Sequence, residues 1–134
     1  MLSYRHSFHA GNFADVLKHI VLIQILEHLS KKDKPICCID THAGPGEYQL
    51  NSEFALKNKE FENGIGQLWQ LDNPPDSVAS YINVLKHFNP DGILNRYPGS
   101  PLIIKHFLRN RDRVFLHELH STEIDLLNTV IGND

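Results

Sequence analysis

The apolar positions in the first part of the chain follow a helical period. They recur every three or four residues between Asn12 and Lys31, which is the spacing of one face of an α-helix. These positions are Phe13, Val16, Leu17, Ile20, Ile23, Leu26 and Leu29. The stretch from Lys31 to Pro35 ends the pattern, because a proline and the residue before it resist helical geometry. The sequence therefore predicts one long helix over 12–31.

Two short apolar runs have the pattern of strands. The first, PICCID, is apolar up to Asp40, as is typical of parallel strands that are buried on both faces. The second, RVFLHEL at 113–119, alternates and ends on Glu118 and Leu119. The following STEIDLLNTVIG predicts a helix with a serine or threonine cap and with Glu123 soon after the cap.

The region between the two runs is polar and has a helical pattern. Helices are expected over 52–58, 61–71 and 77–88, with turns at DNPPDS and NPDG. Two strands are fewer than an independently stable sheet usually needs. We therefore expect an α/β fold that is truncated, with further strands beyond Asp134. In this division 1–46 and 98–134 form the first part of one domain, and 47–97 is a helical insertion.

Residues that carry chemistry follow the two predicted strands. In open α/β sheets ligands bind outside the carboxyl ends of the strands, and the glycines of DTHAGPG would let the backbone approach a ligand closely. A carboxylate after the next strand accepts hydrogen bonds from ribose hydroxyls, ordinarily about 20 residues after the glycines. Glu118 follows Asp40 by 78 positions. The helical insertion accounts for the additional residues between Asp40 and Glu118. This long separation disfavours a simple Rossmann dehydrogenase.

Composition and charge narrow the possible partners. A chain of 134 residues with 41% hydrophobic content suffices for one globular domain. Its net charge of −3 gives no overall attraction to nucleic acid, so any RNA contact requires a local basic cluster. The N-terminal part offers one such cluster, which consists of Arg5, His6, His9, Lys18 and His19.

Neither a signal peptide nor a membrane span is expected. The longest apolar run, 20–26, is interrupted by Gln24. The adjacent Cys37 and Cys38 cannot build a disulfide framework and are expected to be reduced and buried. These observations favour a cytoplasmic protein without a membrane partner.

Several motifs resemble the RlmJ family of bacterial methyltransferases, which modify N6 of an adenine in 23S ribosomal RNA. They are MLSYRHSFHAGNFADVLKH, DTHAGPGEYQL, YINVLKHFN, YPGSPLI and HELH. The resemblance runs from Met1 to about Thr122 and corresponds to the amino-terminal half of the family. It implies a Rossmann-like, S-adenosylmethionine-dependent methyltransferase fold with an inserted helical subdomain. It also implies ribosomal RNA as the partner, and we expect a monomer.

The resemblance also implies roles for individual residues. The family's cofactor-binding residues fall on His19, His42, Ser100 and Glu118. The residues that approach the target RNA fall on Tyr4, His6 and Lys18, and an aromatic ring near a flipped base is a sensible stacking partner. Lys18 and His19 would meet the methionine carboxylate of the cofactor.

The catalytic motif of the family is not found in this chain. Adenine-N6 methyltransferases carry an Asp-Pro-Pro-Tyr type motif, whereas NPPD at 73–76 lacks the aromatic residue and precedes the second strand. We interpret NPPD as a turn that opens a helix. The catalytic residues are therefore unknown and expected beyond Asp134, and residues 1–134 alone are expected to be inactive.

Other interpretations of the same residues stay open. His19, Tyr4, Asp40 and Glu118 are each compatible with a purely structural role, and the paired histidines around 6–9 and 117–120 lack further ligands for a recognisable metal site. The chain is also compatible with an RNA-binding module without catalysis, in which the basic N-terminal arm docks on phosphates. A nucleotide-dependent enzyme would need a GKS or GKT loop or a full GxGxxG, and neither is present.

Overall fold

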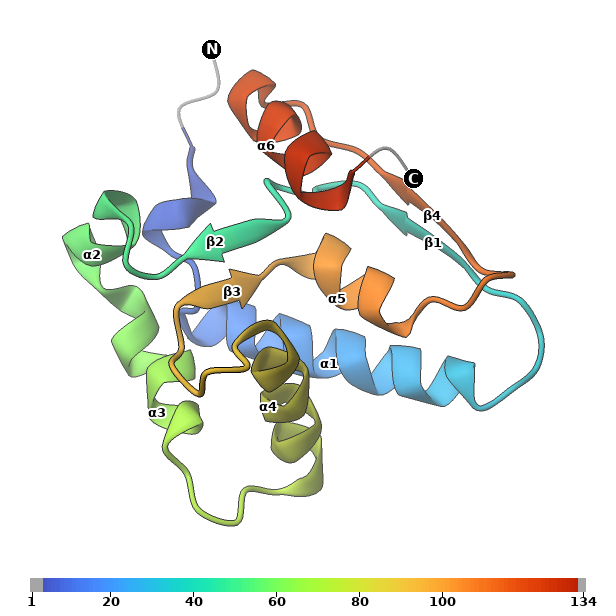
Figure 1. Cartoon of the computed structure of the whole chain (residues 1–134), viewed down its shortest axis with the longest axis horizontal. Coiled ribbons are helices and arrows are strands. Elements are labelled where there is room, and N and C mark those ends of the chain that lie inside the picture. The colour runs from blue at the N-terminus through green and yellow to red at the C-terminus, as the bar shows by residue number, and fades with distance from the viewer. Residues whose placement is uncertain (1–3, 133–134) are drawn as a thin grey trace.

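The structure, a computed structural model, describes residues 4–132 and is mixed α/β (Figure 1). The α-helices are α1 Phe13–Ser30, α2 Glu53–Asn58, α3 Ile65–Trp69, α4 Asp76–Phe88, α5 Ser100–Phe107 and α6 Ser121–Ile131. The strands are β1 Cys37–Asp40, β2 Glu47–Gln49, β3 Arg96–Pro98 and β4 Arg113–Leu116. Short 3-10 helices occupy His6–Phe8 and Glu60–Asn63.

Helix α1 confirms the long helix that the apolar period predicts. Asn12 caps it by accepting a hydrogen bond from the Asp15 N–H at 3.0 Å. The helix packs against α4 and α5, and Ile23 and Leu26 are fully buried there. Phe13 and Leu17, two positions of the predicted apolar face, are nevertheless largely exposed, because α1 is apolar on more than one side and only one side meets the rest of the described chain.

Strands β1 and β4 form a parallel pair with the register Cys37↔Arg113 to Asp40↔Leu116. The two predicted strands are confirmed, but the expected burial on both faces is wrong. Helix α5 packs against both strands, whereas the side chains of Cys37, Ile39 and Phe115 alternate to the other face and are exposed. The prediction that both cysteines are buried is therefore also wrong: Cys37 is exposed and Cys38 is only half-buried.

A second, unpredicted pair of strands lies at the two ends of the region 47–97, for which only helices are predicted. β2 and β3 run antiparallel, with Tyr48 opposite Tyr97 in the core and Glu47 ion-paired to Arg96 at the edge. This pair brings together the two ends of the predicted insertion, and α2, α3 and α4 lie between them in the chain (Figure 1). The sequence pattern also does not predict α5, which follows β3 after one residue.

The insertion contains the predicted helices with one break. α2 and α4 match the expected 52–58 and 77–88, and NPPD does open α4. The expected helix over 61–71 is divided at Gly64, where a Cβ would lie 2.1 Å from the carbonyl oxygen of Gly11. The Ile65 N–H donates to the same oxygen at 2.9 Å. This close approach holds the N-terminal arm, residues 4–12, against the insertion.

The carboxyl-terminal elements differ from expectation in two details. β4 ends at Leu116, so Glu118 lies in the loop that follows the strand instead of at its end. The cap of α6 is His120, whose ring nitrogen Nδ1 accepts from the Glu123 N–H at 3.4 Å, in place of the expected serine or threonine. An imidazole nitrogen can cap because, like a hydroxyl oxygen, it accepts a hydrogen bond.

Candidate cofactor and RNA site

A cavity of about 740 Å³ lies at the carboxyl ends of β1 and β4. Its walls come from the N-terminal arm, the first half of α1, the glycine turn after β1, the start of α5 and the loop between β4 and α6. All seven residues for which the sequence predicts a ligand contact line this cavity. They are Tyr4, His6, Lys18, His19, His42, Ser100 and Glu118.

Glu118 ties the glycine turn to the loop before α6. Its Oε2 accepts from the Gly44 N–H at 2.7 Å, and its Oε1 accepts from the His120 N–H at 2.8 Å. The turn itself depends on glycine, since Gly44 and Gly46 have φ values of 66° and 85°. A carboxylate has about four acceptor sites, so Glu118 keeps capacity for two further hydrogen bonds toward the cavity.

Asp40 organises the other side of the turn. Its Oδ1 accepts from the His42 N–H at 3.1 Å, which makes it a cap of the turn, and its Oδ2 accepts from the Ser100 hydroxyl at 2.5 Å. Ser100 is thereby held at the first residue of α5. The His42 ring is exposed, and its Nδ1 lies 2.9 Å from the Thr41 hydroxyl. The ring is therefore accessible from the cavity that it lines.

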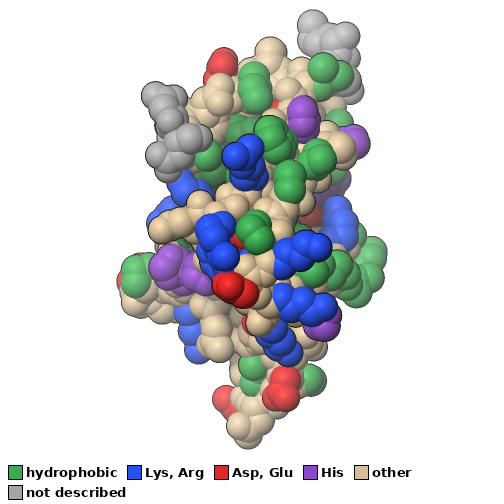
Figure 2. Space-filling model, turned by 90° about the vertical axis from the view of Figure 1, so that its right-hand side faces the viewer, with side chains coloured by type: hydrophobic (Ala, Val, Ile, Leu, Met, Phe, Trp, Pro, Cys, Tyr) green, Lys and Arg blue, Asp and Glu red, His purple; other side chains and the backbone are tan. Residues whose placement is uncertain are grey.

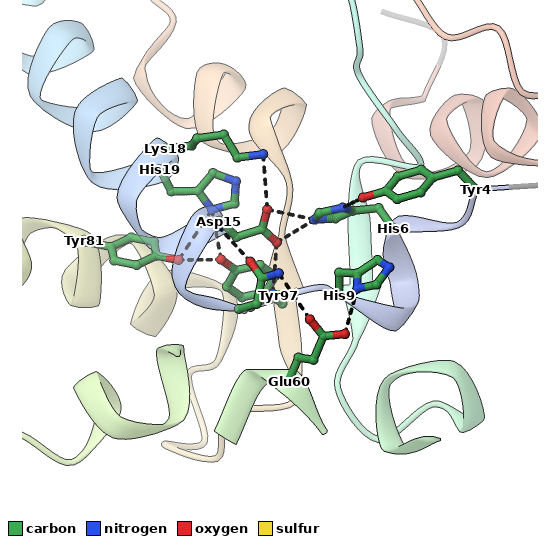
Figure 3. Close-up of polar contacts among 11 residues, drawn as sticks. Tyr4, His6, His9, Asp15, Lys18, His19, Glu60, Tyr81 and Tyr97 are labelled. Atoms are coloured by element: carbon green, nitrogen blue, oxygen red, sulfur yellow. Dashed lines mark hydrogen bonds and ion pairs between the residues drawn. The ribbon is translucent and has the colours of Figure 1, made fainter. Parts of the chain in front are cut away.

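The N-terminal arm and α1 are joined by a chain of hydrogen bonds (Figure 3). The Tyr4 hydroxyl lies 2.7 Å from His6 Nδ1, and His6 Nε2 lies 2.7 Å from the Asp15 carboxylate. Asp15 is buried and also accepts from the Gly11 N–H at 3.0 Å. A neutral His6 that accepts from Tyr4 donates its Nε2 proton to Asp15. Tyr4 is therefore oriented through His6 by a buried carboxylate.

Burial and neighbouring groups set the charges of Asp15 and Tyr4 in this series of hydrogen bonds. Burial alone would raise the pKa of Asp15, but the hydrogen bonds from the His6 ring and the Gly11 N–H favour the charged form, so the pKa is lowered and the carboxylate is ionised. Partial burial and the negative charge of Asp15 raise the pKa of Tyr4, which keeps its proton. Lys18 Nζ lies 3.7 Å from Asp15 Oδ1 and is largely exposed. Lys18 thus supplies a positive charge at the cavity wall.

His19 enters the cavity as a neutral ring. Its Nδ1 lies 3.1 Å from the Tyr97 hydroxyl and 3.4 Å from that of Tyr81, and the two hydroxyls are 2.7 Å apart. Burial lowers the pKa of His19 to about 4, and it raises the pKa of both tyrosines. A protonated tyrosine hydroxyl can donate or accept, and when Tyr97 donates to Nδ1, Nε2 carries the hydrogen. His19 can therefore donate one hydrogen bond but brings no charge.

Comparison with known proteins identifies the family of the chain. The family described as "Ribosomal RNA large subunit methyltransferase D, RlmJ" matches residues 33–134. The chain belongs to the RlmJ family. The match covers β1, the glycine turn, the insertion, Ser100 and Glu118, so most of the cavity lies inside it. The resemblance drawn from the sequence motifs is confirmed.

The relatives include proteins from several bacteria. The chain is 54% identical over 134 residues to "Ribosomal RNA large subunit methyltransferase J" of Escherichia coli and 47% identical over 135 residues to the protein of that name from Haemophilus influenzae. It spans 48% of the length of each, which is about half. A crystal structure of a Legionella pneumophila protein matches 89% of this chain and 43% of its own, with a TM-score of 0.82 and 44% identity. The described chain therefore has the fold of about half of that protein.

Two cavity residues of this RlmJ family chain were not singled out as site residues from the sequence. One of them, Asp15, follows the Asn12 cap by three positions and so lies in the first turn of α1. Glu123 was assigned only a part in helix capping. It is buried, lines the cavity, and its Oε2 has no hydrogen-bond partner among the described residues. The unpaired oxygen is itself buried, so only other parts of Glu123 border the open cavity.

The insertion meets the N-terminal arm beside the cavity (Figure 3). Glu60 accepts from His9 Nδ1 at 2.7 Å, and its other oxygen lies 3.4 Å from the Asn12 amide nitrogen. The ring of Tyr4 stacks on that of His9, with centroids 5.6 Å apart and planes 13° apart. The position of Tyr4 therefore depends on the insertion as well as on α1.

Within residues 4–132, no group of three or more His, Cys, Asp and Glu side chains is arranged to hold a metal ion. Among the helices of the same range, none combines the length and the hydropathy that crossing a bilayer requires.

Proposed function

We propose that the complete protein is an S-adenosylmethionine-dependent methyltransferase that modifies N6 of an adenine in 23S ribosomal RNA. The observation that carries this proposal is the single cavity in which the glycine turn and Glu118 face the arm that bears Tyr4. One side of such a cavity suits a nucleoside, and the other presents an aromatic ring and a cation. The names of the relatives support ribosomal RNA as the substrate.

The residues present fit this cofactor. Ribose hydroxyls need acceptors, and Glu118 has unused acceptor sites. Lys18 would hold the methionine carboxylate by charge, while His19 would donate a neutral hydrogen bond to it. His42 and Ser100 would complete the site from the two sides of the glycine turn.

S-adenosylmethionine, when bound, supplies a methyl group on a positively charged sulfur. The part of this chain in the reaction is to bind and to orient. Tyr4 would stack on the extruded adenine, and the chain through His6 to Asp15 would fix the direction of its hydroxyl. The general acid or base is proposed to lie beyond Asp134, so that residues 1–134 alone would bind without methylating.

The finer description of the fold is part of the same proposal. A Rossmann-like methyltransferase domain would contain 1–46 and 98–134, of which residues 1–3 and 133–134 lie outside the described part, and 47–97 would be its helical subdomain. The antiparallel pair of β2 and β3 supports this division, because it closes the base of the insertion. We further propose that the protein acts in the cytoplasm as a monomer.

The substitution Glu118→Ala tests the cofactor assignment. We expect it to weaken the binding of S-adenosylhomocysteine by about 1.5–3 kcal/mol, the range for a hydrogen bond to a charged group, which is about ten- to a hundredfold in Kd. Glu62→Ala, which removes an exposed glutamate from the insertion, is the matched control. Calorimetric titration with S-adenosylhomocysteine measures the affinity of the natural protein and of each variant. Competition with NAD tests which class of nucleotide the natural protein binds.

Three results would count against the proposal. Unchanged affinity in a folded Glu118→Ala protein would remove the ribose assignment. Displacement of the ligand by NAD would point to a different nucleotide enzyme. RNA binding that weakens with salt, without any binding of S-adenosylhomocysteine, would favour the alternative of an RNA-binding module without catalysis.

A further inference from the structure

Basic side chains gather at the end of the molecule where β1 and β4 begin. Segments 31–34 and 109–113 lie side by side there, and together they carry six lysines and arginines against two aspartates. The six are Lys31, Lys32, Lys34, Arg109, Arg111 and Arg113, which we call the basic end. Figure 2 looks onto this side and shows lysine and arginine side chains grouped on one face. A local charge of +4 contrasts with −3 for the whole chain.

Two arginines build the basic end into a rigid surface. Arg109 donates to the carbonyl oxygens of Lys32 and Lys34 at 2.6 and 2.9 Å, and its Nε donates to Asp112 at 2.9 Å. Arg111 bonds to both the carbonyl oxygen and the carboxylate of Asp33. These bonds fix the loop after α1 against the loop before β4, and they use both acids of the two segments.

The other four cations are left without a carboxylate. Lys31, Lys32, Lys34 and Arg113 are exposed, and in the described part of the chain no hydrogen bond or ion pair engages their charged groups. Segments 31–34 and 109–113 hold no apolar residue, and the exposed Leu29 and Phe115 lie two positions outside them. Four free cations within two segments that carry no apolar side chain suit phosphates better than a lipid bilayer, where buried apolar area contributes to binding.

The basic end is separate from the cavity. Lys18 at the cavity and Lys31 at the end of α1 are 13 residues apart, which is about 20 Å at the rise of an α-helix. The cavity lies at the carboxyl ends of β1 and β4, whereas the basic end lies at their amino ends. No small ligand can touch both, but a folded RNA can.

We propose that the basic end is a second RNA-binding surface, which holds phosphates of the ribosomal RNA about 20 Å from the target nucleotide. This inference rests on the proposed function. Phosphate contacts fix the position of a nucleic acid without reading its sequence. Two anchored points, the cavity and the basic end, set the direction in which the RNA crosses the protein, so the basic end would favour a structured substrate over a short single strand.

The triple variant Lys31→Gln, Lys32→Gln, Lys34→Gln tests this surface. Binding of a fluorescent 23S rRNA fragment to the natural protein would be measured over a series of salt concentrations. We expect affinity at 0.1 M salt to fall about tenfold and the slope of log K against log salt to decrease by about 2–3, as for three lost phosphate contacts. The control Lys57→Gln, Lys59→Gln, Lys86→Gln changes the same charge on the insertion and should have a smaller effect.

The outcomes separate this inference from the proposed function. Wild-type protein that does not bind S-adenosylhomocysteine would contradict the proposed function. A basic-end variant that still binds S-adenosylhomocysteine normally and keeps the affinity and salt slope of the wild type for RNA would overturn the second surface alone. Equal losses in the control variant, or a loss of binding to phosphatidylglycerol vesicles without a loss of RNA binding, would also overturn it.

Discussion

At the scale of single residues, Asp15 determines how the N-terminal arm is held. Its carboxylate bonds to the His6 ring and to the Gly11 N–H, and it lies near Lys18. A buried carboxylate with these partners stays charged and fixes the ring that orients Tyr4. The residue that a target base would meet is therefore exposed, while the residue that positions it is buried.

His19 leads to a prediction about pH. Its pKa is about 4 in the folded protein and about 6.5 when unfolded. Between these values the unfolded chain binds the additional proton, so His19 makes the free energy of unfolding decrease as pH falls from about 6.5 toward 4, by at most about 1.4 kcal/mol per pH unit. The substitution His19→Gln should remove this part of the slope, whatever its effect on stability at pH 7.

Urea unfolding at a series of pH values measures the slope for both proteins. His28→Gln is a suitable control, since it removes an exposed histidine from the same helix. If wild type and His19→Gln lose stability equally between pH 6.5 and 4.5, the assignment of His19 as a buried, neutral ring with a lowered pKa is wrong.

The candidate site could be predicted from the sequence only in part. The seven residues carried over from the family do converge on one cavity, although their individual roles stay predictions. Asp15 and Glu123 were not assigned to the site, because their importance comes from burial and from partners that no local pattern reveals. The neutral state of His19 likewise results from its burial, and its hydrogen-bond partners Tyr81 and Tyr97 are more than 60 positions away.

At the scale of elements, regular periodicity decides what the sequence predicts well. α1 and α4 are long enough for their period to be visible, and β1 is marked by its apolar run. β2 and β3 have three residues each, too few to show alternation, and they exist because Tyr48 and Tyr97 pair across the insertion. The wrong prediction that β1 is buried on both faces has a different cause. The apolar composition of β1 is compatible with burial on both faces, while one face is exposed in the described chain.

The contact between Gly11 and Gly64 offers a test at this scale. Gly64→Ala would place a Cβ 2.1 Å from the Gly11 carbonyl oxygen, so the arm and the insertion must move apart. We expect a loss of stability of about 1–3 kcal/mol, as for other overpacked sites, together with greater protease sensitivity of the arm. Glu62→Ala, which truncates an exposed side chain two positions before Gly64, serves as the control. A Gly64→Ala protein as stable as the wild type would show that the close contact is incorrect.

At the scale of the whole molecule, the basic end and the cavity lie at opposite ends of the parallel strands β1 and β4. The cavity and the N-terminal arm occupy the carboxyl ends, and the basic end occupies the amino ends. A row of exposed apolar residues, namely Phe13, Leu17, Val21 and Ile25, follows α1 between them. The chain spans about half the length of the curated relatives, and the exposed β1 and α1 faces are those of this half alone.

The most direct test of the account is a methyl-transfer assay with the natural protein. Unmodified 23S rRNA and S-adenosylmethionine carrying a labelled methyl group would be incubated with it, and the digested nucleosides would be identified by mass spectrometry. We predict label in N6-methyladenosine, with loss of the label in Tyr4→Ala because the target base loses its stacking partner. Absence of labelled RNA, or label on any other atom or base, would contradict the proposed function.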